Sequence, residues 1–157
     1  MQLYKACLGA LVLLTAAGCA SGSKITWRVY EEVGGSLPES HVQIAELPKY
    51  HLRIPIDPIP VLTEKDIQAA EIHPTAGGDA VLVRYDIEAT MRVEELTTRD
   101  RGRYLVVFWN DRPVAAWLVD QRLTNGQFLV EGDFTDEEAA VIVRNLNRLG
   151  GKNPHGR

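Results

Sequence analysis

Residues 104–109, Tyr-Leu-Val-Val-Phe-Trp, are hydrophobic at every position. A strand with no polar face must be covered on both sides, so this run belongs in the middle of a sheet. A turn over 110–112 leads from it into a second extended run, 114–122. Asn125-Gly126, the strongest two-residue hairpin signal in the chain, leads into a third run, 127–131. These signals predict a three-stranded antiparallel meander.

One further strand and two helices accompany the meander. Residues 79–85 alternate between two faces, which predicts a strand. Asp86 is a favoured cap for a helix that runs to about Arg101, and Gly102 suits the left-handed conformation that ends a helix. Near the C-terminus, Thr135 and Glu138 have the spacing of a capping box and predict the start of a second helix.

A third helix is predicted after Thr63. Thr63 and Asp66 form a capping pair, Ile67 and Ala70 fall on one face, and His73-Pro74 ends the helix because the residue before proline avoids the helical region. Helices that interrupt an antiparallel sheet and carry one apolar stripe each must cover a face of that sheet. We therefore expect an α+β fold in two layers: an antiparallel sheet, made of the meander plus one further strand, with about three helices on one face.

The apolar faces of these elements predict one hydrophobic core within a domain over 61–149. Its expected members are Ile67, Val93, Leu96, Val107, Leu129, Ile142, Val143 and Leu146. The preceding segment, 25–60, is expected to be extended chain with one or two short or edge strands, because five prolines and Gly34-Gly35 interrupt strand pairing. Residues 150–157 are expected to form a flexible tail.

The N-terminus resembles a bacterial lipoprotein signal. A lone Lys5 precedes an apolar run, 6–17, which is shorter than a membrane span and typical of a secretory signal. Small residues directly before Cys19 resemble a lipobox, which implies a signal peptide over 1–18 and acyl chains, such as palmitate, on Cys19. Lipidated Cys19 would hold the protein on a membrane, because two or more acyl chains anchor stably.

Removal of the signal peptide would leave residues 19–24 as a polar tether and would also remove Cys7. The protein would face the periplasm, with the outer membrane slightly favoured because no aspartate follows the lipidated cysteine. An ordinary signal peptide cut near Ala17 or Ala20 is the alternative.

Composition argues against most enzymatic and nucleic-acid functions. The net charge of −4 and the lack of a basic run disfavour nucleic acid as a partner. Every serine lies at or before Ser40, so the 61–149 domain has no serine nucleophile, and it has no cysteine. The histidines are scattered, and the pairs Glu94-Glu95 and Glu137-Glu138 are interpreted as a solvated helix face and a helix start. We expect no enzyme activity, metal or cofactor.

Three phrases of the chain carry a family resemblance. They are LTEKDIQAAEI, VLVRYDIEATMRVEELTTRDRGRYLVVFWNDRPV and NGQFLVEGDFTDEEAAVIVRNL. Together they resemble the head subdomain of the first periplasmic domain of SecD, a subunit of the bacterial SecDF protein-export complex. In that family a helix ends in a Leu-Thr pair, matched here by Leu96-Thr97, and a closing phrase Ile-x-Gly-x-Phe-Thr-x-Glu-Glu-Ala is matched by residues 130–139.

The departures from the family pattern limit what the resemblance implies. Arg112 stands where the family usually has glycine, and Leu118 where it commonly has proline. No second apolar segment approaches the length of a membrane span, so proton-driven translocation is not carried over. The resemblance implies a free-standing head module on a lipid anchor. In the family this module is thought to contact exported polypeptides, with components of the Sec translocon as further candidate partners.

Aromatic residues near the meander are the candidates for a binding surface. Phe108 and Phe134 are assigned to the core, whereas Trp109 and Trp117 are candidate peptide-binding residues. They would line a groove for an extended apolar peptide, or the sheet edge would accept an added strand. The leading hypothesis is a non-enzymatic lipoprotein that binds polypeptide as an accessory to export. The alternative is a self-associating or scaffolding envelope lipoprotein unrelated to export.

Overall fold

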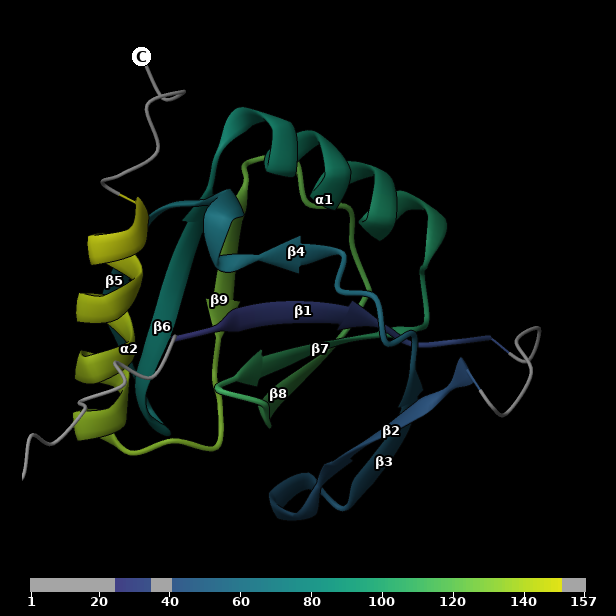
Figure 1. Ribbon diagram of the computed structural model, residues 1–157, viewed down its shortest axis with the longest axis horizontal. Coiled ribbons are helices and arrows are strands. Elements are labelled where there is room, and N and C mark those ends of the chain that lie inside the picture. The colour runs from purple at the N-terminus through teal and green to yellow at the C-terminus, as the bar shows by residue number, and fades with distance from the viewer. Residues whose placement is uncertain (1–24, 35–40, 151–157) are drawn as a thin grey trace, which may run out of the picture.

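The computed structural model describes residues 25–34 and 41–150. The predicted signal peptide, Cys19, the tether and the tail after Gly150 lie outside these residues. Figure 1 shows two sheets whose strands run across one another, with helices at the top and at one side. The strands are β1 (Trp27–Glu31), β2 (Gln43–Leu47), β3 (Leu52–Ile56), β4 (Leu62–Thr63), β5 (Ile67–Thr75), β6 (Gly78–Tyr85), β7 (Tyr104–Trp109), β8 (Arg112–Leu118) and β9 (Gln127–Val130). The α-helices are α1 (Ile87–Arg99) and α2 (Asp136–Gly150), and short 3-10 turns lie at Pro48–Tyr50 and Glu64–Asp66.

The predicted α+β class is confirmed, and every strand pair in the described residues is antiparallel. The strand orders are β4-β1-β7-β8 in the first sheet and β5-β6-β9 in the second, and β2 and β3 form a separate hairpin. The doubly apolar β7 lies inside the first sheet, between β1 and β8, as its composition predicts. The helix caps are also confirmed: Asp86 accepts from the N–H of Ala89, and Thr135 and Glu138 bond reciprocally.

The predicted three-stranded meander is wrong at its third strand. β7 and β8 pair as expected, but β9 pairs with β6 in the other sheet, with Phe128 opposite Val83. Gly126 does adopt a positive φ of 65°, but its carbonyl accepts a hydrogen bond from Tyr85. The Asn-Gly turn signal is local. Burial of β9 beside β6 decides its partner, and this is a long-range effect.

The predicted third helix, 63–73, is also wrong. The capping pair forms, since the N–H of Thr63 donates to Asp66 at 2.7 Å, but it starts only one 3-10 turn. The chain then extends as β5, which pairs with β6 from Ile67 to Thr75. A long antiparallel ladder with a buried face outweighs the weak local preference for helix. The described residues therefore contain two α-helices rather than three.

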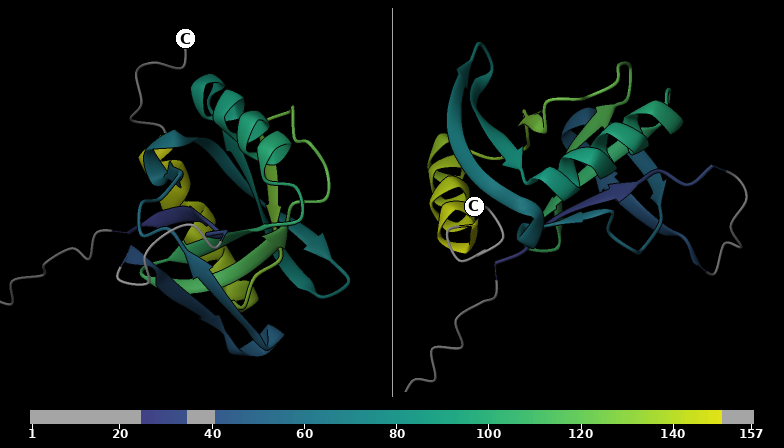
Figure 2. Two further views of the ribbon diagram at one scale, coloured as in Figure 1. Left: turned by 90° about the vertical axis from the view of Figure 1, so that its right-hand side faces the viewer. Right: turned by 90° about the horizontal axis from the view of Figure 1, so that it is seen from above.

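The first sheet is covered on both faces. One face joins the main core, which it shares with the second sheet and with the apolar stripes of α1 and α2. The other face, with Tyr30, Val106 and Phe108, packs against the β2–β3 hairpin. Figures 1 and 2 show this hairpin on the side of the sheet opposite α1. The segment expected to be largely irregular therefore supplies a second, smaller core around Ile54 and Ile56.

Most of the expected core is present. Ile67, Val93, Leu96, Val107, Ile142 and Leu146 are buried, and Val143 is half-buried against the same cluster. The prediction that Leu129 belongs to the core is wrong, because its side chain is 40% exposed. In β9 the inward positions belong to Phe128 and Val130, and alternation along a strand places the residue between them on the other face.

Helix α2 lies along the β5–β6 hairpin and closes its outer edge. The side-chain amide of Asn147 accepts from the N–H of Ala70 and donates to its carbonyl, both at 2.8 Å. Asn147 thus occupies the place of a neighbouring strand. The end of the helix approaches so closely that a Cβ on Gly150 would lie 2.8 Å from the carbonyl oxygen of Ile67.

Candidate peptide-binding groove

A surface groove of about 240 Å³ lies where β6, β8 and β9 approach the connection that follows β8. It is lined by Leu82, Trp117, Gln121, Leu123, Asn125, Gln127, Phe128 and Leu129. Leu82 and Leu129 are directly opposite each other on neighbouring strands, so they form an apolar pair in the lining. All the lining side chains are uncharged, and three of them are amides.

Trp117 contributes to the groove from β8. It lies opposite Leu105 in the β7–β8 ladder and is half-buried against the main core. Its ring meets that of Phe128 edge to face, with centroids 5.2 Å apart and planes at 82°. This arrangement suits the quadrupoles of both rings and fixes the orientation of the indole. Trp117 therefore joins the two sheets at the groove.

Helix α1 holds the connection from β8 to β9 in place. The Thr97 hydroxyl donates to the carbonyl of Val93 at 2.8 Å and accepts from the N–H of Leu123 at 3.0 Å. Arg122 forms an ion pair with Glu94 on the same helix. Thr97 is fully buried, which gives a structural reason for the Leu-Thr pair at this helix end. Two of the three amides that line the groove, Gln121 and Asn125, thus lie on an anchored segment.

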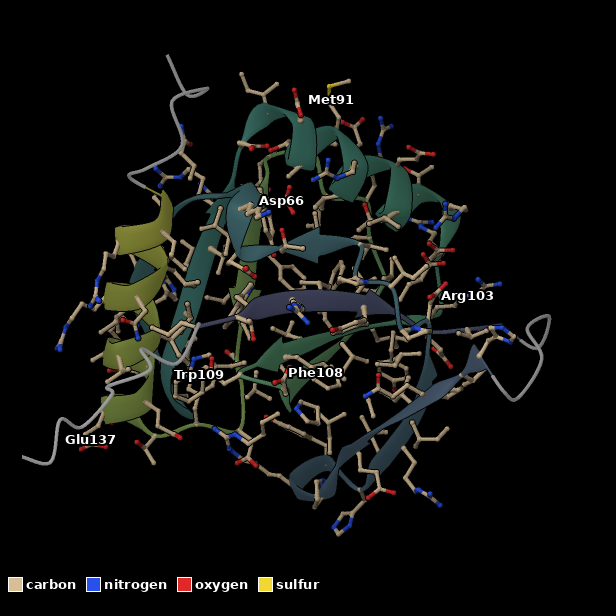
Figure 3. The ribbon with its side chains drawn as sticks, viewed as in Figure 1. Asp66, Met91, Arg103, Phe108, Trp109 and Glu137 are labelled. Carbon is tan, nitrogen blue, oxygen red and sulfur yellow. The ribbon has the colours of Figure 1, made fainter. Side chains whose placement is uncertain are left out.

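The two tryptophans predicted to bind peptide do not lie in one groove. Trp109 is opposite Arg112 beside the β7–β8 turn, whereas Trp117 is opposite Leu105 farther along the hairpin. Trp109, labelled in Figure 3, is half-buried against the main core, and the guanidinium carbon of Arg112 lies 5.7 Å from the centre of its ring. Only Trp117 is among the residues that line the groove.

The two phenylalanines assigned to the core have different surroundings. Phe108 is buried in the second core, where its ring lies edge to face with Tyr30 at 4.9 Å. Phe134 is half-buried against the main core. It lies so close to Gly132 that a Cβ there would be 2.1 Å from its ring. Both placements agree with the core assignment.

The acidic pairs take structural positions. Glu138 caps α2 and pairs with Arg112 at 3.1 Å, and Glu137 is exposed on the outer side of the helix in Figure 3. Glu94 pairs with Arg122, and Glu95 is exposed. Residues 25–34 and 41–150 hold no group of three side chains suited to bind a metal, and none of their helices is long and apolar enough to cross a membrane.

A charged cluster joins the end of β1 to the end of α1. Arg99 bridges Glu31 and the buried Asp100, at 2.8 and 2.9 Å, and Arg103 approaches the same two carboxylates. Burial and the nearby Asp100 carboxylate raise the pKa of Glu31, and Arg99 offsets only part of that rise. None of these four residues lines the groove, and the cluster connects secondary-structure elements.

Sequence reasoning found Trp117 but missed the rest of the groove. The apolar character of Leu129 alone suggests a core position, but its two neighbours in the strand, Phe128 and Val130, are also apolar and must face the opposite side. Leu82 has the same pattern between Val81 and Val83. An apolar residue at an outward strand position is the signal that could have identified both. Their proximity depends on the β6–β9 pairing, which the chain order conceals.

The described residues thus form an antiparallel α+β domain with two crossed sheets and an uncharged surface groove. The chain belongs to the SecDF P1 head subdomain family, whose model matches residues 42–148. This match confirms the resemblance seen in the sequence, and it includes the β2–β3 hairpin. No curated protein matches the chain in sequence.

Solved structures of SecDF share the fold. A crystal structure of SecDF in a super-membrane-facing form has a TM-score of 0.60 and 21% identity, over 78% of this chain and 18% of that chain. A structure of SecDF as a membrane component that enhances protein export has a TM-score of 0.59 and 20% identity, over 78% of this chain and 61% of that chain. This chain thus covers less than two thirds of either protein, and at these identities the likeness establishes the fold.

Proposed function

We propose that this protein is a lipid-anchored, non-enzymatic module of the cell envelope that binds polypeptide as an accessory to protein export. Membership of the SecDF head family supports a role related to export. The observation that carries the binding function is the uncharged groove beside Trp117. Apolar side chains with a few amides suit an unfolded segment, because they bury its apolar groups and can hydrogen-bond its backbone.

Trp117 is the proposed anchor of the bound segment. It is held by Phe128 and by the core, so it loses little conformational freedom on binding. Trp109 stays a predicted second contact near the β7–β8 turn. Lipidation of Cys19 and attachment of the protein to a membrane facing the periplasm, with the outer membrane favoured, complete the proposal.

Binding of a chemically unfolded exported protein by the full chain tests the function. Trp117→Ala should weaken the affinity about 30-fold, because an interface anchor contributes at least about 2 kcal/mol. The control is Ile87→Ala, which removes an exposed apolar side chain on α1 that is outside the groove. Equal weakening by both variants, or none by Trp117→Ala, would contradict the assigned site.

Crosslinking in living cells, with partners identified by mass, separates this function from the scaffold alternative. Capture of unfolded, newly exported chains supports the proposal. Failure of the purified protein to bind unfolded chains, together with capture of folded envelope proteins, would favour scaffolding. The anchor is tested separately by the intact mass of the wild type and of Cys19→Ser, and the absence of an acyl-sized difference would refute lipidation.

A further inference from the structure

We propose that the outer edge of β9 accepts an extended, uncharged polypeptide as an added strand, with Leu129 as the central backbone contact. The inference rests on the proposed function and specifies how the polypeptide is held. β9 is the last strand of the β5-β6-β9 sheet, and no strand of the described residues pairs with its outer side.

Strand alternation shows which backbone groups of β9 are available. The Gly126 carbonyl accepts from the N–H of Tyr85 on the β6 side. In an antiparallel pair every second residue bonds to the same neighbouring strand, so Phe128 and Val130 also bond to β6. The N–H and C=O of Leu129 therefore point away from β6. Gln127 agrees with this pattern, because its N–H donates to the Asn125 side chain at 3.0 Å and not to β6. Leu129 has no hydrogen bond beyond the strand within the described residues.

The opposite edge of the same sheet follows the same alternation. Ala70 lies opposite Val83, which in turn lies opposite Phe128. The groups of Val83 point to β9, so those of Ala70 must point outward, and they do, because Asn147 binds both of them. Leu129 thus offers the same donor and acceptor pair that Ala70 uses, without an equivalent of Asn147.

The groove beside this edge selects the kind of strand. A bound strand would turn alternate side chains toward Leu82, Leu129 and Trp117, which favours apolar groups at those positions. The volume of about 240 Å³ is many times the roughly 10–15 Å³ that one water needs by the same measure, so side chains can enter. No charged side chain lines the groove, so a charged residue bound there would lose hydration without gaining a partner.

The main test is amide hydrogen exchange in the full chain with a capped octapeptide of alternating valine and threonine. We expect the peptide to slow exchange of the Leu129 amide at least tenfold, with Phe128 and Val130 as internal controls that change less than twofold. Two further peptides are N-methylated at either the odd-numbered or the even-numbered residues. One of them should bind at least tenfold more weakly than the unmethylated peptide, and the other less than twofold more weakly.

Two variants at one position separate backbone from side chain. Leu129→Pro removes the outward N–H and leaves the bonds to β6, a position at which an edge strand tolerates proline. It should abolish peptide protection, whereas Leu129→Ala keeps the N–H and should weaken binding less. If proline disturbs folding, the N-methylated peptides on the unmodified chain still decide.

The outcomes distinguish this inference from the function on which it rests. Peptide binding that leaves the Leu129 amide unprotected, or that is affected equally by the two N-methylation patterns, overturns strand addition but not polypeptide binding. Failure to bind both the octapeptide and an unfolded exported protein overturns both. Protection of Leu129 that rises with protein concentration alone would assign the edge to a second copy of this chain, and would also overturn the proposal.

Discussion

The two edges of the β5-β6-β9 sheet differ in whether their outward backbone groups are hydrogen-bonded. At β5, α2 lies against the strand and Asn147 binds the outward backbone groups of Ala70. At β9, the corresponding groups of Leu129 have no bond within the described residues and lie beside an uncharged groove. Proteins normally cover or charge exposed strand edges, because such edges invite pairing with other chains. An edge that is covered on one side and left open beside a groove on the other is consistent with a binding role for the open side.

The largest expected effect comes from loosening the helix that closes the β5 edge. Leu146 is fully buried on α2, so Leu146→Ala should lower the free energy of unfolding by about 2 to 5 kcal/mol. Urea unfolding measures this. Val141→Ala, at a 40% exposed position of the same helix, is the matched control and should change stability by less than about 1 kcal/mol. A Leu146→Ala variant as stable as the wild type would mean that α2 does not depend on its apolar stripe.

Opening the β5 edge directly should have the next largest effect. Asn147→Ala leaves the N–H and C=O of Ala70 without their partner and should cost about 1 to 3 kcal/mol in unfolding free energy. Asn147→Asp keeps an acceptor for the N–H but loses the donor to the carbonyl, so it should retain part of this stability near neutral pH. Equal stability of all three proteins would show that the side chain does not close the edge.

Amide exchange at the two edges can be compared directly in the unmodified protein, where the expected effect is smaller. The Ala70 amide should exchange at least tenfold more slowly than the Leu129 amide, equivalent to about 1.4 kcal/mol, because only the first is hydrogen-bonded. Residue-resolved hydrogen exchange without any added peptide provides the measurement. Comparable rates at the two positions would remove the distinction between a closed and an open edge.

The smallest expected effect concerns Glu31, which lies on β1 in the other sheet. It tests whether a change in global stability leaves the difference between the two edges unchanged. The raised pKa of Glu31 means that the folded state favours its neutral form. Its contribution to stability is therefore full below the unfolded pKa of about 4.3, and is lost as the pH rises through the folded value. Glu31→Gln should unfold at higher urea than the wild type at pH 7, and the difference should vanish near pH 3.5. The exchange ratio of Ala70 to Leu129 should not change, and a reversed pH trend would contradict the pKa direction.

Local patterns predicted much of the fold correctly. The doubly apolar run of β7, the alternation in β6 and the caps at Asp86 and Thr135 each depend on residues close together in the chain. Such signals act through backbone geometry and short-range hydrogen bonds, so the sequence alone is enough to read them. The phrases that resemble the family are equally local, so the sequence alone carries that resemblance.

Tertiary pairing decided what these patterns could not. Residues 67–75 form a strand because they pair with β6 and bury one face. β9 is not part of the expected meander because its inward residues are buried beside β6. The same pairing set the alternation that turned the backbone of Leu129 outward. Val83 and Phe128 are far apart in the chain, and the free energy that joins them comes from burial and strand pairing. Local conformational preferences do not depend on contacts between residues far apart in the chain. Only the folded structure therefore determined where the groove lies and which edge is open.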